Sequence, residues 1–121
     1  MTFEVEVVLK GRHFAVTETV VGPQGSPESW NEQAIRDVLV EVLRAIDRVQ
    51  NPEAPRDRAV SLTGFSWIVE PSDGKSVIAI EIPMGAAVAG PFPIAQDTLD
   101  KLVTNVIRTE RMKAHTGPTI H

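Results

Sequence analysis

Residues 3–21 read FEVEVVLKGRHFAVTETVV, and the fold follows from how this stretch alternates. In residues 3–9 every second side chain is apolar, with two glutamates among the residues between, which is typical of a strand with one buried face. Residues 10–12 include a glycine suited to a tight turn. Residues 13–21 are rich in β-branched side chains, so the whole stretch predicts a β-hairpin.

Glu18 interrupts the apolar face of the second predicted strand, between Val16 and Val20. A carboxylate that faces a core loses hydration unless it is paired. The position is therefore explained by a bulge, by a strand end or by the edge of the sheet.

An amphipathic helix follows the hairpin. Ser26 precedes Pro27, a good first residue of a helix, and Ser29 precedes Glu32 at the spacing of a capping box. Apolar side chains then recur at helical spacing. We therefore predict a hairpin–helix unit over residues 3–50.

The same order of elements recurs later in the chain. Residues 59–69 and 76–82 predict two strands, joined by a turn at 72–74 that contains an Asp-Gly step. Gly64 marks a change in the apolar register, which fits a bulge. Apolar positions at helical spacing in 94–113 predict a second helix.

These elements predict an α+β fold of the form ββαββα, in which a four-stranded, mainly antiparallel sheet carries two helices on one face. The hairpin–helix units 3–50 and 59–113 form a pseudo-repeat of pattern, joined by a linker at 51–58. Both units share one core, so residues 1–113 form a single domain, which suits a chain of 121 residues. Residues 114–121 are predicted to be a flexible C-terminal tail.

Composition limits the classes of function. The chain has 16 acidic and 12 basic residues, a net charge of −4, and no cysteine. An acidic chain has no general attraction to nucleic acid, so we predict no nucleic-acid partner. The lack of a long apolar run and of a signal-like start predicts no membrane partner, and together with the absent cysteines predicts a cytoplasmic protein.

No catalytic constellation is visible in the sequence. His13, His115 and His121 have no partner at metal-ligand spacing on a shared element. No Ser, Thr or Lys lies in a nucleophile motif, and the loop at 22–27 matches neither phosphate-binding fingerprint. We therefore predict no catalytic, cofactor-binding or metal-binding residues and no cofactor, and we favour a protein that is not an enzyme.

Glu4, Glu6 and Glu81 form a predicted acidic face, because alternation places all three on the outer side of the sheet. Paired carboxylates can perform acid–base chemistry. The alternative is a solvated face that protects the sheet against strand addition.

The segment 83–93, PMGAAVAGPFP, is unusual because it connects strand to helix without a polar side chain. Connecting segments usually lie on the surface and are polar. Three interpretations stay open: an interface, a part of the core or a ligand lid. Trp67 is predicted to lie in the core, and Trp30 to be partly exposed beside the segment. The candidate interface residues are Trp30, Met84, Val88, Pro91 and Phe92.

These observations support three hypotheses. The first is a non-enzymatic protein-interaction module, acting as a homo-oligomer or on a protein partner. The second is a small enzyme or ligand-binding protein whose site forms between subunits. Paired hairpin–helix units assemble in this way in the tunnelling folds, which is an analogy at the level of the fold only. The third is an acidic inhibitor or immunity-type partner that mimics an anionic surface.

Overall fold

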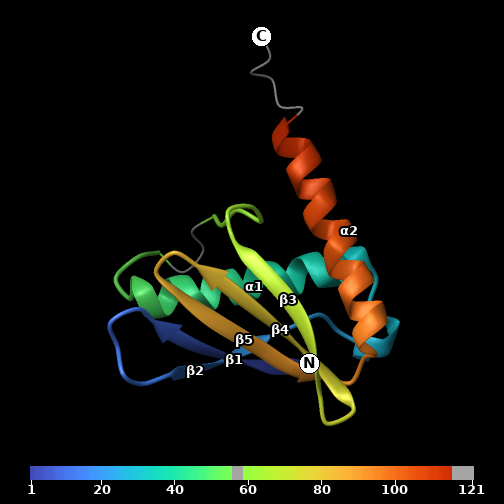
Figure 1. The fold of residues 1–121 in the computed structure, drawn as a ribbon, viewed down its shortest axis with the longest axis horizontal. Coiled ribbons are helices and arrows are strands. Elements are labelled where there is room, and N and C mark those ends of the chain that lie inside the picture. The colour runs from blue at the N-terminus through green and yellow to red at the C-terminus, as the bar shows by residue number, and fades with distance from the viewer. Residues whose placement is uncertain (56–58, 116–121) are drawn as a thin grey trace.

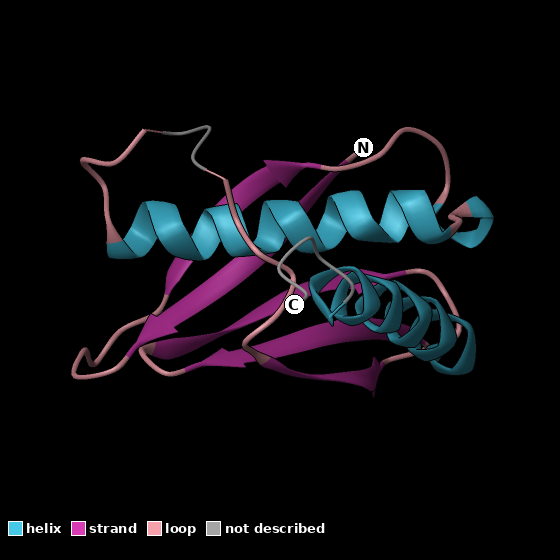
Figure 2. Ribbon diagram, turned by 90° about the horizontal axis from the view of Figure 1, so that it is seen from above, coloured by secondary structure: helices cyan, strands magenta, loops and turns pink. Residues whose placement is uncertain are grey.

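The computed structural model describes residues 1–55 and 59–115, with the backbone alone at 114 and 115. Over these residues the chain forms a five-stranded antiparallel sheet with two α-helices on one face of it (Figure 1, Figure 2). The predicted α+β class is confirmed, but the predicted number of strands is wrong. In chain order the elements are β1 (Thr2–Leu9), β2 (Val16–Val21), the 3-10 helix η1 (Pro27–Ser29), α1 (Glu32–Gln50), β3 (Ser66–Ser72), β4 (Lys75–Ile82), β5 (Gly85–Phe92) and α2 (Gln96–His115).

The strands are ordered β2-β1-β5-β4-β3, and each neighbouring pair is antiparallel. β1 and β2 form the N-terminal hairpin that alternation predicts. Phe3, Val5 and Val7 of β1 are buried, while the residues between them are exposed. One face of the sheet therefore carries the core, which α1 and α2 cover.

The missing strand is β5, which lies within the segment predicted as a connection. It occupies the centre of the sheet, between β1 and β4, and so joins the two halves of the chain. Its backbone N–H and C=O groups are paired with the strands on both sides, so the segment needs no polar side chains to satisfy them. Ala87 and Ala89 are buried in the core. The core interpretation therefore holds for the inward-facing residues, and a central strand cannot act as a lid.

A bulge near the end of β5 brings its largest side chain into the core. Ile78 pairs with Ala89 and Ser76 with Phe92, so β5 has one more residue than β4 over this interval. Gly90 adopts φ 116°, which favours glycine, and the extra residue turns Phe92 inward. Phe92 is fully buried, whereas Pro91 is exposed.

Phe92 is the centre of an aromatic cluster. Its ring meets Phe3 of β1 at 5.2 Å and Trp30 at 5.3 Å between centroids, both edge-on. Trp30 is 7% exposed, so the prediction of a partly exposed side chain is wrong. Its proximity to the apolar segment is confirmed, as a core contact. Trp67 is half-buried and packs against the core from β3.

Several predicted boundaries are wrong. β3 covers 66–72 rather than 59–69, because Gly64 adopts φ 83° and ends a loop instead of forming a bulge within a strand. β2 begins at Val16, after a wider turn in which Phe14 is exposed. α2 runs from Gln96 to His115 and so extends into the predicted tail, whose residues 116–121 lie outside the described part.

The halves of the chain differ more than the predicted pseudo-repeat implies. The first contributes a hairpin and a helix, and the second a three-stranded meander and a helix. The pseudo-repeat of 3–50 and 59–113 is therefore not confirmed. Residues 56–58 of the predicted linker lie outside the described residues.

The start of α1 tests the predicted helix cap. Asn31, not Ser29, is the N-cap, and its Oδ1 accepts a hydrogen bond from Ala34 N at 2.9 Å. Ser26 instead caps the short helix η1. We expect Asn31→Ala to lower the free energy of unfolding by about 1 kcal/mol, because a backbone N–H of the first turn loses its partner. Denaturant unfolding measures this difference. Ser29→Ala is the matched control and should cost less, and the reverse order would contradict the assigned cap.

Glu18 is explained by its place at the sheet edge and by an ion pair. β2 is an edge strand, one of the predicted explanations. Arg48 Nε of α1 donates to Glu18 Oε1 at 3.0 Å, so the carboxylate that faces the helices has a partner. Both side chains remain partly exposed, and an ion pair of this kind adds little stability.

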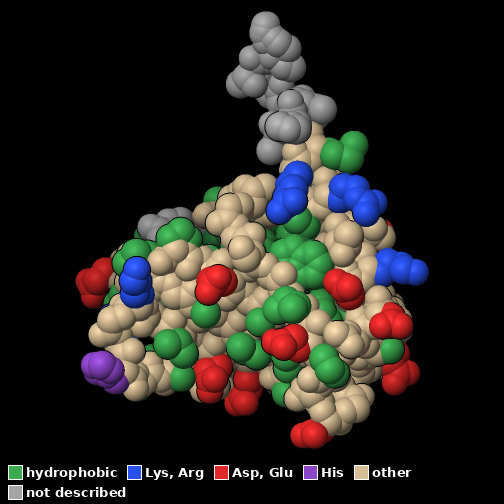
Figure 3. All heavy atoms as spheres, in the orientation of Figure 1, with side chains coloured by type: hydrophobic (Ala, Val, Ile, Leu, Met, Phe, Trp, Pro, Cys, Tyr) green, Lys and Arg blue, Asp and Glu red, His purple; other side chains and the backbone are tan. Residues whose placement is uncertain are grey.

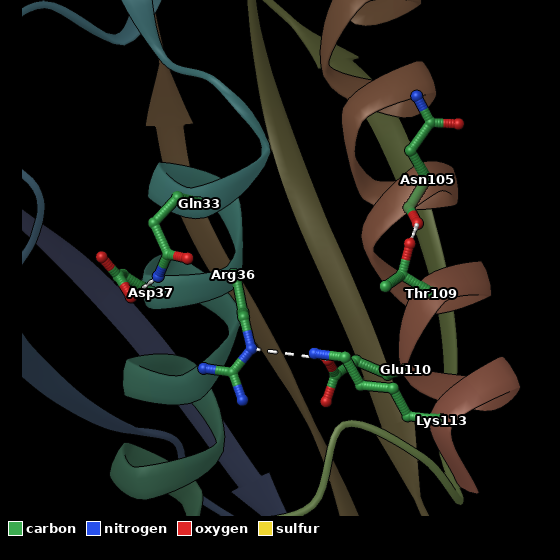
Figure 4. A network of polar contacts seen from close by, with 7 residues as sticks. All are labelled: Gln33, Arg36, Asp37, Asn105, Thr109, Glu110 and Lys113. Atoms are coloured by element: carbon green, nitrogen blue, oxygen red, sulfur yellow. Dashed lines mark hydrogen bonds and ion pairs between the residues drawn. The ribbon is translucent and has the colours of Figure 1, made fainter. Parts of the chain in front are cut away.

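Polar side chains also join the two helices (Figure 4). Arg36 Nε of α1 donates to Glu110 Oε2 of α2 at 3.5 Å, and Lys113 Nζ reaches the same oxygen at 3.3 Å. Asn105 Nδ2 donates to Glu32 Oε2 at 3.1 Å. The Arg36 and Lys113 side chains are partly or largely exposed, so these contacts lie near solvent.

Candidate interaction surface

The sheet has one face without helices, which we call the open face. Because successive strand residues point to opposite sides, the buried residues of each strand identify those that face outward. α1 contacts β1 and β2, and α2 contacts β3 and β4, so both helices pack on the core face. The outward residues are Thr2, Glu4, Glu6 and Val8 of β1, Thr17, Thr19 and Val21 of β2, Ser66, Ile68 and Glu70 of β3, Val77, Ala79 and Glu81 of β4, and Ala86 and Val88 of β5.

The centre of the open face is apolar. Val88 pairs with Ala79, which pairs with Ile68, so these three side chains form one row across the sheet. Val8 pairs with Ala86 in the adjacent row. Val8, Val88 and Ile68 are 42%, 40% and 55% exposed. Apolar side chains that adjoin across three strands form a patch, unlike the single exposed residues found on most surfaces.

The apolar centre is hollowed. A depression of about 350 Å³ is lined on this face by Ile68, Ala79, Glu81, Ala86 and Val88. The alanines of β4 and β5 form its floor because their methyl groups rise little above the backbone. The hollow is therefore a direct consequence of the small residues in the central strands.

Acidic side chains surround the hollow. Glu6 pairs with Val88, Glu81 pairs with Ala86, and Glu4 and Glu70 are exposed on the same face. In Figure 3, which views this face, Asp and Glu side chains are interspersed with hydrophobic ones, while Lys and Arg lie toward the margins. The open face therefore combines apolar side chains with negative charge.

A larger cleft of about 830 Å³ adjoins the hollow at one end of the sheet. Its lining includes Lys10 beyond β1, Phe65 before β3 and Arg111 of α2. Glu81 and Ala86 line both the cleft and the hollow, so the two depressions adjoin at these residues. The cleft brings cationic and anionic groups together.

The predicted site residues fall into two groups. Glu4, Glu6 and Glu81 lie together on the open face and are exposed, as the alternation predicts. Val88 lies beside them. Met84, in the turn between β4 and β5, and Pro91 are also exposed. Trp30 and Phe92 lie in the core, so they cannot form a surface of the folded chain.

Sequence reasoning missed Val8, Ile68 and Ala86 as candidate surface residues. A signal existed for two of them. Val8 occupies an outward position of an alternating strand, and Ile68 lies between the inward-facing Trp67 and Val69. Ala86 had no such signal, because its segment was not predicted as a strand.

Nothing in the described residues indicates metal chemistry. Residues 1–55 and 59–115 contain no group of three or more His, Cys, Asp or Glu side chains that could hold a metal ion. No helix in this part of the chain is long and apolar enough to span a bilayer.

No protein-family model matches the chain, and no curated protein or solved structure matches it significantly.

Proposed function

We propose that this chain is a protein-interaction module that binds through its open face. The observation that carries the proposal is the apolar hollow around Val88, exposed at the centre of a sheet whose other face is covered by helices. Exposed apolar side chains gathered across several strands are costly in water unless a partner covers them. The acidic rim at Glu6 and Glu81 supplies orientation and specificity, as charged rims do at protein interfaces.

The central strand supports a binding role over a purely structural one. A strand at the middle of a sheet can carry polar outward side chains, such as threonine, without disturbing the core. β5 instead presents Ala86 and Val88 to solvent. Its inward residues Ala87 and Ala89 account for core packing, so packing does not explain the outward ones.

The proposal is tested by changing Val88 alone. We expect Val88→Lys to reduce partner binding at least tenfold, because it replaces the apolar centre with a cation that repels a cationic partner. The measurement is quantitative recovery of a stoichiometric partner on immobilised protein, followed by titration of that partner. Because Val88 is 40% exposed, we expect the variant to fold, and circular dichroism checks this.

Val21→Lys is the matched control for that experiment. It makes the same change at a more exposed valine, 74% exposed, at the far end of the edge strand β2. Binding should be preserved in this variant. Equal loss of binding in both variants, or none in either, would reject the hollow around Val88 as the binding site.

The end cleft favours a second candidate function, a ligand-binding protein or small enzyme with a site completed by another subunit. Lys10, Glu81 and Arg111 line the cleft and offer both signs of charge to a small polar ligand. Val88 does not line it, so Val88→Lys separates the two functions. The acidic rim is also what an inhibitor or immunity-type protein requires for a basic partner, and this third function uses the same surface as the first.

A further inference from the structure

The C-terminal end of α2 carries the positive charge that the centre of the open face lacks. We call Arg108, Arg111, Met112 and Lys113 the basic end of α2. All four residues are exposed, and Figure 1 shows this end of the helix extending beyond the sheet. Arg108 and Arg111 form no ion pair with another described residue within 4 Å. Positive charge and apolar surface therefore lie together on one protruding helical segment.

We propose that the basic end of α2 of one copy docks on the open face of a second copy. The proposal rests on the open face being a binding surface and names its partner as the chain itself. Charge complementarity carries it. Glu4, Glu6, Glu70 and Glu81 lie on the open face, and the basic end carries Arg108 and Arg111, which form no ion pair with another described residue, besides Lys113, which pairs with Glu110 of its own helix.

Within one copy the two surfaces adjoin at the end cleft, which Arg111 and Glu81 both line, but they form no ion pair there. α2 packs on the core face of the sheet through Val103, Val106 and Ile107, which are buried. The helix therefore presents its basic end beyond the sheet, and the open face lies on the opposite side. A contact between two copies pairs the arginines of one copy with the open-face glutamates of the other.

A dimer in which the two open faces pack against each other is a less favourable way to cover the apolar hollow. Such a contact brings the glutamates of both copies to one interface, where like charges are unfavourable. The strand residues of the open face supply no cation near the hollow, since Lys75 lies at the start of β4 and Lys10 beyond β1. A helix end that carries arginines covers the apolar centre and neutralises its rim.

The contact is small, which sets the conditions for its detection. Residues 108–115 span two turns, roughly 12 Å of helix. An interface of this size gives weak association, so sedimentation velocity should cover about 10 µM to 1 mM protein. We expect self-association at low ionic strength that weakens when salt is added, because exposed charges are screened. A monomer at every concentration in low salt overturns the inference.

Charge-reversal variants on each surface test whether the basic end and the open face are in contact. We expect Arg108→Glu/Arg111→Glu and Glu6→Lys/Glu81→Lys each to raise the dissociation constant about 100-fold or more, because each opposes like charges. An equimolar mixture of the two variants should recover association, since each then meets its complement. Self-association that survives the arginine reversal, or a mixture that stays monomeric, overturns the inference.

Asp100→Lys and Lys101→Glu are the matched controls. Both residues are exposed on α2 and lie outside the basic end and the open face. Their reversal should leave self-association unchanged. The outcome is independent of the Val88→Lys experiment, because a chain that stays monomeric can still bind a different protein through its open face.

Discussion

Phe92→Ala is expected to lower the free energy of unfolding by about 3–5 kcal/mol, the range for removing a buried aromatic ring. Phe92 is fully buried and contacts Phe3 and Trp30 edge-on, so its loss leaves a cavity and ends two aromatic contacts. These contacts connect β5 to β1 and to the segment that precedes α1. The expected loss of stability therefore includes weaker contacts between the two halves of the chain. Equilibrium unfolding in urea measures the change.

Phe14→Ala is the matched control, because it makes the same substitution at a ring that is 60% exposed in the turn after β1. Its effect should stay within about 0.5 kcal/mol. A small effect at Phe92 would mean that the bulge at Gly90 does not turn this ring into the core.

Much of the fold could be predicted from local pattern. β1 and β4 were predicted because their apolar residues alternate, and α1 because its apolar residues recur at helical spacing. These patterns depend on which face of an element is buried, and that information is present in each segment alone. Element ends were predicted less accurately, since Ser29 has the spacing of a capping box but Asn31 is the N-cap of α1.

β5 could not be predicted in the same way. Its sequence, GAAVAGPF, contains residues that are depleted in strands, and a proline inside a strand argues against a central position. The bulge near its end accommodates Pro91, and pairing with β1 and β4 stabilises the rest. Those partners are distant in the sequence, so the segment becomes a strand through tertiary pairing. Its lack of polar side chains was the available signal.

The same error limited the prediction of the site. The acidic face was predicted because Glu4, Glu6 and Glu81 lie on strands that alternation identifies. The apolar hollow needs the register of β5, which places Val88 beside Ala79 and Glu6. Without that strand, Val88 and Phe92 looked equivalent. The structure separates them, because one lies on each face of the sheet.

Gly85→Ala is expected to lower the free energy of unfolding by about 3 kcal/mol, a large effect for the addition of one methyl group. Gly85 begins β5 and pairs with Leu9 of β1 and Ile82 of β4. A Cβ atom at this position would clash with the Val8 carbonyl oxygen and lie 3.1 Å from Leu9 Cα. Both neighbours are backbone atoms, so the conflict is relieved only when β1 and β5 move apart. That movement disrupts the pairing that joins the two halves of the chain.

Gly22→Ala provides the comparison, because the atoms that its Cβ would meet belong to a side chain. They are ring carbons of Phe3 at 3.0 Å, and a small rotation of that ring relieves the contact. The expected cost is therefore about 1 kcal/mol, near the low end for overpacking. Urea unfolding of both variants measures the difference, and the open face supplies a second readout. Because Ala86, which follows Gly85, forms part of the floor of the hollow, displacement of β5 should also weaken binding in Gly85→Ala, while Gly22→Ala binds normally. Equal stability of the two variants would contradict the close approach of β1 and β5 at this end of the sheet.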